Sequence, residues 1–274
     1  MKKLKELIRK YGKASFNSMT KYPSILTLHK IAGDGRTLLP ELTTIFDKEK
    51  PMFSTEKIDG CNVRLVFYNG EFMIGSRDSF LHYMDDVYYS TDYDIVDTMY
   101  KLLPLAGLAE RIHYNGYHDK LVVVYGELFG GTQLPKAKNY GRSAMGFRVF
   151  DVCVFSETQM HDEILFQDTT KISSWREGKR DHGMYYGQPF MSYNFMEAFC
   201  LEFGFGSAPM VPFYMHGTAF DQVLSDMQQA LPHTNVALSD DALKRPEGIV
   251  VRTNDRSRIF KLRFEEYERT PKSR

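Results

Sequence analysis

Residues 54–64 have the sequence Ser54-Thr55-Glu56-Lys57-Ile58-Asp59-Gly60-Cys61-Asn62-Val63-Arg64, and this stretch decides how the fold is interpreted. It places Lys57 directly before a glycine turn that opens into a run of strand-forming residues. A lysine held out of bulk water at such a position is expected to have a lowered pKa, which makes its free amine available as a nucleophile. Lysine-acid-glycine turns are common, so the remaining sequence must supply the context.

Charged residues recur further along the chain inside runs that are otherwise apolar. Glu127 lies in such a run, and a carboxylate there must be paired, hydrogen-bonded, or bound to a metal or ligand. Lys261 and Arg263 are two apart on a predicted strand, so both project from the same face. The blocks that follow residues 54–64 are, in order, Val124–Gly130 with Glu127, Phe147–Val152 with Phe150 and Asp151, Pro246–Arg252 with Glu247, and Ile259–Phe264 with Lys261 and Arg263.

In this order the five blocks resemble the covalent nucleotidyltransferase superfamily, which comprises ATP-dependent DNA ligases, RNA ligases and mRNA capping enzymes. The resemblance extends from about Tyr22 to Phe264, and within the superfamily the chain most resembles the RNA ligase 2 family. Three details favour that branch: the Glu-Lys-Ile opening at 56–58, Asn62 five residues past the lysine, and the run Phe195–Cys200 that leads into Phe203-Gly204-Phe205 and Ala208-Pro209.

The resemblance implies an ATP-dependent RNA ligase that joins 5′-phosphate and 3′-hydroxyl ends, with Mg²⁺ or Mn²⁺ as the metal. The lysine attacks the α-phosphate of ATP to give lysyl-AMP, the AMP passes to a 5′-phosphate end, and a 3′-hydroxyl displaces it. The expected substrate is RNA, either a nicked duplex or broken ends, with DNA strands in hybrid duplexes as a further substrate. Such phosphoryl chemistry depends mainly on positioning and charge stabilisation.

The resemblance also assigns roles to single residues. It implies that Lys57 is the nucleophile, that Glu127 contacts the ribose or a divalent metal, and that Glu247 is the second carboxylate near the metal. Magnesium suits such a site because this ion takes few carboxylates plus phosphate oxygens and water. Lys261 and Arg263 together would bind the triphosphate and lower the pKa of the lysine by like-charge repulsion. The residues expected to bind the nucleotide are Glu56, Ile58, Asn62, Arg77, Glu127, Phe150, Arg252, Lys261 and Arg263.

Several assignments leave alternatives open. Phe150 matches the aromatic residue that stacks on adenine, but it also suits a core position in a buried strand. Asp151 is expected on the opposite strand face, where it serves the nucleic acid or pairs with an arginine. Asp59, expected on the same strand face as Lys57, is common in DNA ligases and capping enzymes. The family usually has lysine at the positions of Arg252 and Arg263, and arginine keeps the charge but binds phosphate as a planar fork.

Three other functions therefore remain alternatives. Two are enzymes, a minimal ATP-dependent DNA ligase and a capping guanylyltransferase. The third is a ligase-derived RNA-binding module without activity, and the retention of Lys57, Glu127, Glu247 and Lys261 argues against it.

The composition is that of an ordinary globular chain of 274 residues, with 43% hydrophobic residues, 26% charged residues and a net charge of zero. No apolar run approaches the length of a membrane span, and no signal peptide is present, so we expect no membrane partner and a cytoplasmic protein, in the host cytoplasm if viral. Three scattered cysteines favour reduced thiols. Candidate RNA-binding surfaces are the N-terminal lysines, the cluster Arg252–Arg263 and the stretch Trp175–Arg180.

The pattern of strand and helix signals predicts an α+β fold with antiparallel sheets and flanking helices. We expect one nucleotidyltransferase domain over 1–274, with a core at about 22–264, a basic segment at 1–21 whose charges form a solvated helix face, and no OB-fold domain. The predicted strands are hairpins 62–67/72–76 and 249–253/258–264 and buried strands 121–128 and 147–155, and the predicted helices are 94–108, 195–203 and 218–231, the last capped by Thr218.

Overall fold

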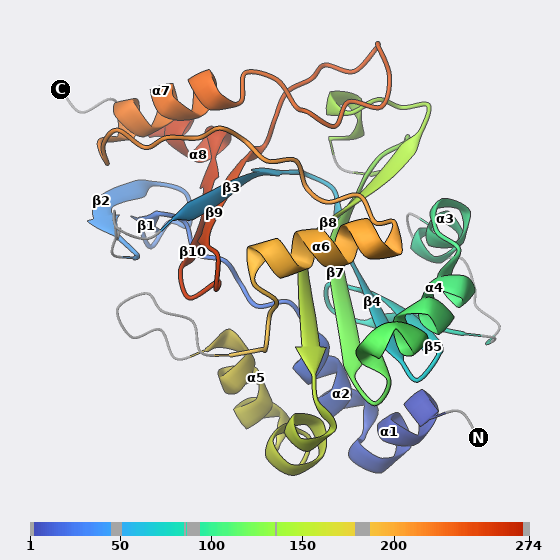
Figure 1. Ribbon diagram of the computed structural model, residues 1–274. Coiled ribbons are helices and arrows are strands. Elements are labelled where there is room, and N and C mark those ends of the chain that lie inside the picture. The colour runs from blue at the N-terminus through green and yellow to red at the C-terminus, as the bar shows by residue number, and fades with distance from the viewer. Residues whose placement is uncertain are drawn as a thin grey trace.

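Three antiparallel sheets form the centre of the molecule in a computed structural model, which describes residues 3–44, 51–84, 86, 94–134, 136–178 and 187–270 (Figure 1). The largest sheet has five strands in the order β6 (Phe80–Tyr83), β5 (Glu71–Ser76), β4 (Cys61–Tyr68), β7 (Leu121–Gly130) and β8 (Met145–Phe155). The second has the order β10 (Ile259–Arg263), β9 (Gly248–Thr253) and β3 (Met52–Lys57), and a small sheet pairs β1 (His29–Ile31) with β2 (Leu38–Leu42).

Helices surround these sheets, and Figure 1 shows α6 lying across the centre of the view. None of the helices in the described residues is long and apolar enough to cross a membrane. The helices are α1 (Lys3–Tyr11), α2 (Lys13–Thr20), α3 (Ile95–Leu102), α4 (Leu105–Ile112), α5 (Thr169–Glu177), α6 (Tyr193–Phe203), α7 (Phe220–Ala230) and α8 (Phe264–Arg269), with shorter helical turns at His113–Tyr117, Ala137–Asn139 and Gln159–Ile164.

The five-stranded sheet is buried on both faces because apolar residues occupy both alternating sets along its central strands. On β7, Val122 and Val124 pack with α3, α4 and α6, whereas Val123 and Tyr125 face the opposite way and pack with α1, α2 and α5. This arrangement confirms the predicted burial of strands 121–128 and 147–155. The three-stranded sheet packs against α7 and α8 in a separate cluster.

The N-terminal helices belong to the packed body of the protein. Leu4 and Phe16 have no exposed surface and pack under the five-stranded sheet, while Arg9 and Lys10 remain exposed on the outer side of α1. The expected solvated face therefore exists, but the core extends beyond the predicted limit at residue 22. The apolar residues in 3–20 recur at short intervals, which indicates a helix face that packs into the core. The basic residues between them concealed this pattern.

Turn chemistry explains the confirmed hairpins. Asn69 and Gly70 connect β4 to β5 with φ values of 50° and 78°, as the predicted Asn-Gly turn requires. Strands β9 and β10 form the second predicted hairpin. Its second strand ends at Arg263, however, and Phe264 begins α8.

Two predicted helices differ in the structure. The helix expected over 94–108 is divided into α3 and α4 at Pro104, because proline cannot continue a helix and restricts the residue before it. Helix α7 begins after Ala219 without a side-chain cap, so Thr218 is not the cap. Helix α6 ends before Gly204 as predicted, with this glycine in the left-handed conformation, but it begins at Tyr193, two residues before the predicted start, because Ser192 caps it.

The packing of Phe16 gives a test of the N-terminal helices as core elements. Replacing Phe16 by alanine removes a fully buried ring beside Phe80 and should cost about 3–5 kcal/mol of unfolding free energy. The matched change Leu201→Ala, at a side chain that is 86% exposed, should cost under about 0.5 kcal/mol. Urea unfolding measures both values. Equal stability of the two variants would contradict a core role for α2.

Candidate active site

A cavity of about 430 Å³ lies between the three-stranded and five-stranded sheets. Strands β3, β9 and β10 supply one side of it, and β4, β7 and β8 supply the other. Its lining includes Lys57 and every predicted nucleotide-binding residue except Arg263. Segments from residue 22 to residue 261 thus converge on one cavity, which is why only the folded chain can form it.

Lys57 is the last residue of β3, and its Nζ lies 2.6 Å from Oε2 of Glu247. The turn that follows packs tightly against β7, because a Cβ on Gly60 would lie 2.1 Å from the carbonyl oxygen of Leu128. Asp59 belongs to this turn and not to the strand, so its predicted place on the lysine's strand face is wrong. Its N–H donates to Tyr140 Oη at 2.7 Å, and burial followed by the charge of Glu247 raises the pKa of its carboxyl.

Glu247 contacts two cations, Lys57, which lines the cavity, and Arg263, which does not. Its Oε1 accepts from Arg263 Nε at 3.0 Å, and Arg263 also contacts Glu266 at 3.3 Å. Lys261 and Arg263 do share the half-buried face of β10, as their spacing predicted. Of the two, Lys261 lines the cavity, whereas Arg263 contacts the carboxylate of Glu247 that also pairs with Lys57.

A row of three polar side chains crosses the five-stranded sheet at the cavity. Asn62 on β4 and Arg148 on β8 lie directly opposite Glu127 on β7 in the strand register. Burial is the main cause that raises the pKa of Glu127, to about 8, and the carboxylates Glu247 and Asp59 add to it. The Oδ1 atom of Asn62 is buried without a hydrogen-bond partner in the described part of the chain. Both features indicate groups that await a ligand.

Three cations of the lining form no ion pair with any acid of the described residues: Arg77, Arg148 and Lys261. Burial lowers the pKa of Lys261, and the charges of Lys57 and Arg263 lower it further. The cavity therefore carries positive charge without matching carboxylates at these three positions, an arrangement that favours an anionic ligand.

Phe150 and Asp151 diverge as strand alternation predicted. Phe150 lines the cavity and meets the ring of Tyr22 edge-on, with the ring centroids 5.0 Å apart. Asp151 has no exposed surface and pairs with Arg252 at 2.9 Å and with Arg256 at 2.6 Å. Of its two predicted roles, pairing with arginine is the one observed.

The side chains that flank Lys57 are held by the protein. The Glu56 carboxylate accepts hydrogen bonds from the Thr234 hydroxyl and from the N–H of Asn235, and burial raises its pKa. Ile58 packs with Phe129 and Tyr140. Both residues line the cavity, and these contacts fix the strand end that carries Lys57.

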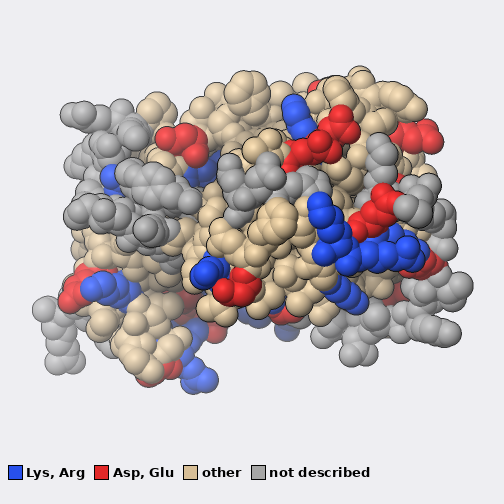
Figure 2. All heavy atoms as spheres, turned by 90° about the horizontal axis from the view of Figure 1, so that it is seen from below, with Lys and Arg blue, Asp and Glu red and all other residues tan. Residues whose placement is uncertain are grey.

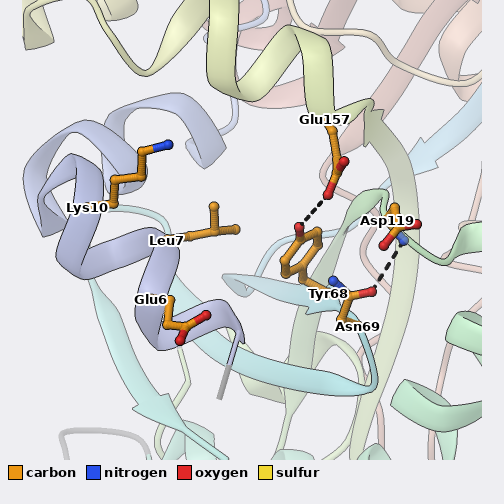
Figure 3. A pocket seen from close by; sticks show the side chains of 7 residues that line it. All are labelled: Glu6, Leu7, Lys10, Tyr68, Asn69, Asp119 and Glu157. Atoms are coloured by element: carbon orange, nitrogen blue, oxygen red, sulfur yellow. Dashed lines mark hydrogen bonds between the residues drawn. The ribbon is translucent and has the colours of Figure 1, made fainter. Parts of the chain in front are cut away.

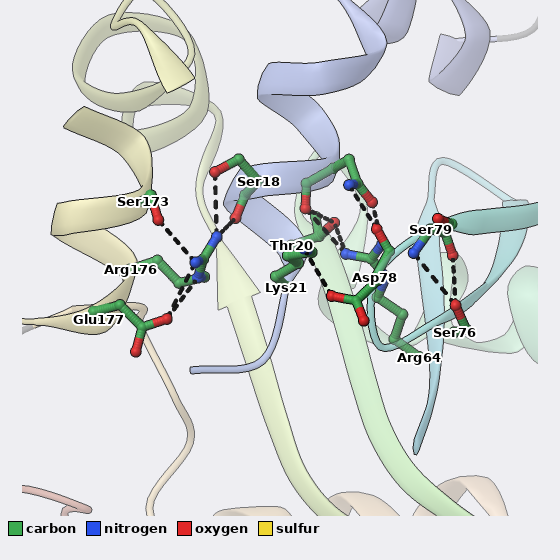
Figure 4. Close-up of polar contacts among 11 residues, drawn as sticks. Ser18, Thr20, Lys21, Arg64, Ser76, Asp78, Ser79, Ser173, Arg176 and Glu177 are labelled. Atoms are coloured by element: carbon green, nitrogen blue, oxygen red, sulfur yellow. Dashed lines mark hydrogen bonds and ion pairs between the residues drawn. The ribbon is translucent and has the colours of Figure 1, made fainter. Parts of the chain in front are cut away.

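The segment 22–25 forms a wall of the cavity. The residues that lead into it are anchored from both sides, and Figure 4 shows Lys21 beside Asp78 and Ser18 beside Arg176. On one side, Lys21 pairs with Asp78 at 2.9 Å, next to the cavity residue Arg77. On the other side, Arg176 Nη1 donates to the Ser18 carbonyl at 2.8 Å, and Glu177 accepts from the N–H of Ser24 at 3.2 Å. Sequence analysis identified neither Tyr22 nor Arg148 as a site residue, although Arg148 is a charge inside an apolar strand, which is the signal that singled out Glu127.

The predicted RNA-binding surfaces are only partly open. Arg252 and Arg256 are occupied by Asp151, and Arg176 is buried against α2, so these arginines do not form a free basic surface. Lys179 and Arg180 lie outside the described residues. Figure 2 shows the molecule from below, where lysines and arginines gather toward one side with acids between them. Among the described residues, Arg9 and Lys10 of α1 are exposed.

A second hollow lies between α1 and the β4–β5 turn and is unsuited to an anion (Figure 3). Its charged lining consists of Glu6, Asp119 and Glu157 against Lys10. Tyr68 donates a hydrogen bond to Glu157 at 3.1 Å. The negative balance here contrasts with the cation-lined cavity between the sheets.

Comparison with known proteins identifies the family. The family model described as RNA ligase matches residues 50–263. The chain belongs to the RNA ligase family. This result confirms the predicted family, and the predicted mixture of helices and antiparallel sheets agrees with the observed fold.

Solved RNA ligases from Naegleria gruberi are similar in structure. A mutant without ligand has a TM-score of 0.50 and 13% identity, over 80% of this chain and 51% of its own. A mutant with ATP and Mn has a TM-score of 0.48 and 11% identity, over 91% of this chain and 60% of its own. A mutant with AMP and Mn has a TM-score of 0.49 and 13% identity, over 90% of this chain and 62% of its own. This RNA ligase family chain thus spans less than two thirds of each solved chain. No curated protein sequence matches it.

The donor set fits a divalent cation that takes most of its ligands from elsewhere. Glu127 and Glu247 provide oxygen donors, and the unpartnered Oδ1 of Asn62 lies opposite Glu127. Within the described residues, no group of three or more His, Cys, Asp and Glu side chains is arranged to hold a metal ion. Magnesium is commonly held by one or two carboxylates together with substrate phosphates, so two glutamates match that requirement. The metal role of Glu127 and Glu247 stays a prediction.

The raised pKa of Glu127 predicts a pH-dependent stability. Between pH 4.5 and about 8 the folded state keeps a proton that the unfolded state loses, so stability falls as pH rises through this window. Glutamine cannot ionise, and Glu127→Gln should therefore raise the melting temperature relative to wild type at pH 9 more than at pH 5. Thermal denaturation without nucleotide or metal measures this difference.

The control is Glu110→Gln, at an exposed carboxyl on α4, which should leave the pH profile of the melting temperature unchanged. A difference between Glu127→Gln and wild type that is the same at pH 5 and pH 9 would show that Glu127 is not held in its protonated form.

Proposed function

We propose that this chain is an ATP-dependent RNA ligase that forms a covalent lysyl-AMP on Lys57 and seals 5′-phosphate to 3′-hydroxyl ends. The observation that carries the proposal is the placement of Lys57 in one cavity with three cations that have no acid partner among the described residues. A triphosphate needs such cations, and a nucleophile within the same cavity can reach its α-phosphate. Membership of the RNA ligase family supports the same reaction.

Glu247 is placed to accept the proton that Lys57 must lose before attack. Its carboxylate oxygen lies 2.6 Å from Nζ, within the hydrogen-bond distance that proton transfer requires. Arg263 stabilises the carboxylate from the other side at 3.0 Å and so limits its movement. The proton leaves the amine along an existing hydrogen bond, and the free amine forms the bond to phosphorus as pyrophosphate departs.

The remaining lining residues hold the nucleotide. Lys261 and Arg77 bind phosphate oxygens, and Phe150 stacks on the adenine ring while Tyr22 supports its edge. Glu127 and Glu247 would hold Mg²⁺ or Mn²⁺, and such an ion would neutralise developing charge on the phosphates. Arg252 lines the cavity with its charge balanced by Asp151, so its contribution is to shape the wall more than to bind phosphate.

RNA is the proposed nucleic-acid substrate, as a nicked duplex or as broken ends, and DNA strands in hybrid duplexes are a further one. We place the reaction in the cytoplasm, in keeping with reduced cysteines at positions 61, 153 and 200. Sealing assays on nicked duplexes with each combination of RNA and DNA strands decide the strand preference.

Covalent labelling tests the nucleophile. Incubation with α-labelled ATP and Mg²⁺, followed by denaturing electrophoresis, should label wild type, and labelled GTP should not. Lys57→Ala should abolish labelling, and Lys57→Arg should do the same because a guanidinium stays protonated. The control Lys30→Ala removes an exposed lysine that also pairs with a glutamate, Glu41, and should label normally. Full labelling of Lys57→Ala would refute the assignment.

Magnesium titration tests the two glutamates. Glu127→Ala and Glu247→Ala should each lower the rate of lysyl-AMP formation about tenfold or more at low magnesium, the usual size for a positioned electrostatic group. Melting temperatures measured alongside separate this effect from loss of fold. Wild-type rates and wild-type magnesium dependence in both variants would show that neither glutamate serves the metal.

A further inference from the structure

Residues 58–60 connect the two sheets of the active site and belong to neither of them. Strand β3 ends at Lys57 in the three-stranded sheet, and β4 begins at Cys61 in the five-stranded sheet. The three residues between these ends lie outside the strand registers of both sheets. Ladder hydrogen bonds therefore fix Lys57 from one side only, and the position of its side chain depends also on what supports the turn.

A small apolar cluster lies under this turn and is separate from the three larger clusters of the described residues. It consists of Ile58, Phe129, Tyr140 and Val236, with Leu238 packed against it. Tyr140 has no exposed surface, and its ring meets that of Phe129 edge-on, with the centroids 5.2 Å apart. Close packing of this kind allows a ring little movement, so the Tyr140 hydroxyl has a defined place.

Backbone contacts hold the loop that carries Tyr140. The N–H of Leu238 donates to the Tyr140 carbonyl at 2.6 Å. The N–H of Gly131, next to the end of β7, donates to the Gly141 carbonyl at 3.1 Å. Gly141 has a φ of 118°, and a Cβ there would lie 2.1 Å from Ser239 Oγ, so the two loops pass each other in direct contact. The tyrosine is thus joined to β7 on one side and to residues 238–239 on the other.

The Tyr140 hydroxyl supports the turn through one hydrogen bond. Its oxygen accepts from the N–H of Asp59 at 2.7 Å. Burial raises the pKa of this hydroxyl, so it stays neutral and adds no negative charge near Asp59 and Glu247. An amide that loses its acceptor inside the protein is destabilised until the backbone moves to another one. Asp59 is two residues from Lys57, and such a movement would change the 2.6 Å contact between the lysine amine and Glu247.

We propose that Tyr140 is a positioning residue of the first step, whose hydroxyl holds the turn so that the Lys57 amine stays where it can attack the α-phosphate. This inference rests on the proposed function, since it concerns the bond that forms between Lys57 Nζ and phosphorus as pyrophosphate leaves. Displacement at phosphorus is sensitive to a misplacement of the nucleophile by about 1 Å. In the last step a 3′-hydroxyl attacks the adenylylated end and AMP leaves, and no bond to Lys57 forms or breaks. That step should therefore not depend on the Tyr140 hydroxyl.

The test measures both steps in Tyr140→Phe, a change that keeps the ring and removes the hydroxyl alone. The kcat of lysyl-AMP formation should fall about tenfold, while the KM for ATP stays within about twofold of wild type, because the nucleotide contacts are unchanged and only the nucleophile is displaced. Sealing of an RNA nick whose 5′ end is already adenylylated should stay within about twofold of the wild-type rate. A protein that is merely less stable would lose both activities in proportion.

The matched control is Tyr68→Phe. It removes the hydroxyl of another buried tyrosine, which donates to Glu157 at 3.1 Å and lies outside the lining of the active-site cavity. It should keep the wild-type kcat in both steps, and melting temperatures show that both variants are folded at the assay temperature. A wild-type kcat of lysyl-AMP formation in Tyr140→Phe, a rise in KM at unchanged kcat, or an equal loss in both steps would overturn the inference. Failure of wild type to label would instead overturn the proposed function.

Discussion

The ion pairs of Asp151 join the two sheets between which the cavity lies. Asp151 comes from β8 of the five-stranded sheet, Arg252 from β9 of the three-stranded sheet, and Arg256 from the turn that follows β9. Removing one member of such a buried group leaves an uncompensated charge and typically costs about 3–5 kcal/mol. The Tyr22 hydroxyl donates to Asp151 at 2.9 Å, so the wall at residues 22–25 depends on the same carboxylate. One buried aspartate therefore helps to fix the two halves of the site relative to one another.

One face of β7 belongs to the core at Val123 and Tyr125 and lines the cavity at Glu127. Val123 and Tyr125 lie under the N-terminal helices, and the Tyr125 hydroxyl donates to the carbonyl of Thr20, the last residue of α2. Two residues further along, Glu127 stands where the helix has ended and the cavity begins. The cavity lining on β7 thus begins just beyond the contact between Tyr125 and the end of α2.

Local signals in the sequence were enough for much of this fold. The Asn69-Gly70 turn and the end of α6 at Gly204 follow from turn and cap chemistry, β7 and β8 follow from their apolar runs, and the structure has all of these. The ordered charged blocks also indicated which residues meet at one cavity. These features depend on residues close in sequence or on a family pattern.

Long-range packing explains what the sequence left undetermined. The ionic contacts of Glu247 and Arg263, the pairing chosen by Asp151 and the wall at Tyr22 depend on which strands become neighbours. Basic residues in α1 masked the apolar face that packs under the sheet. Arg148 carried the same signal as Glu127, a charge inside an apolar strand, but its position opposite Glu127 and beside Gly206 follows only from the strand pairing.

The hydrogen bond from Arg256 to Tyr22 spans 234 positions of the chain, and this separation has a consequence for folding. Contacts so distant in sequence require the closure of a very long loop, and chains dominated by them fold slowly. During synthesis the five-stranded sheet can assemble before β9 and β10 emerge, so the cavity between the sheets is completed after most of the core has formed. Any ligand that binds in this cavity would stabilise the last contacts to be made and would slow their opening.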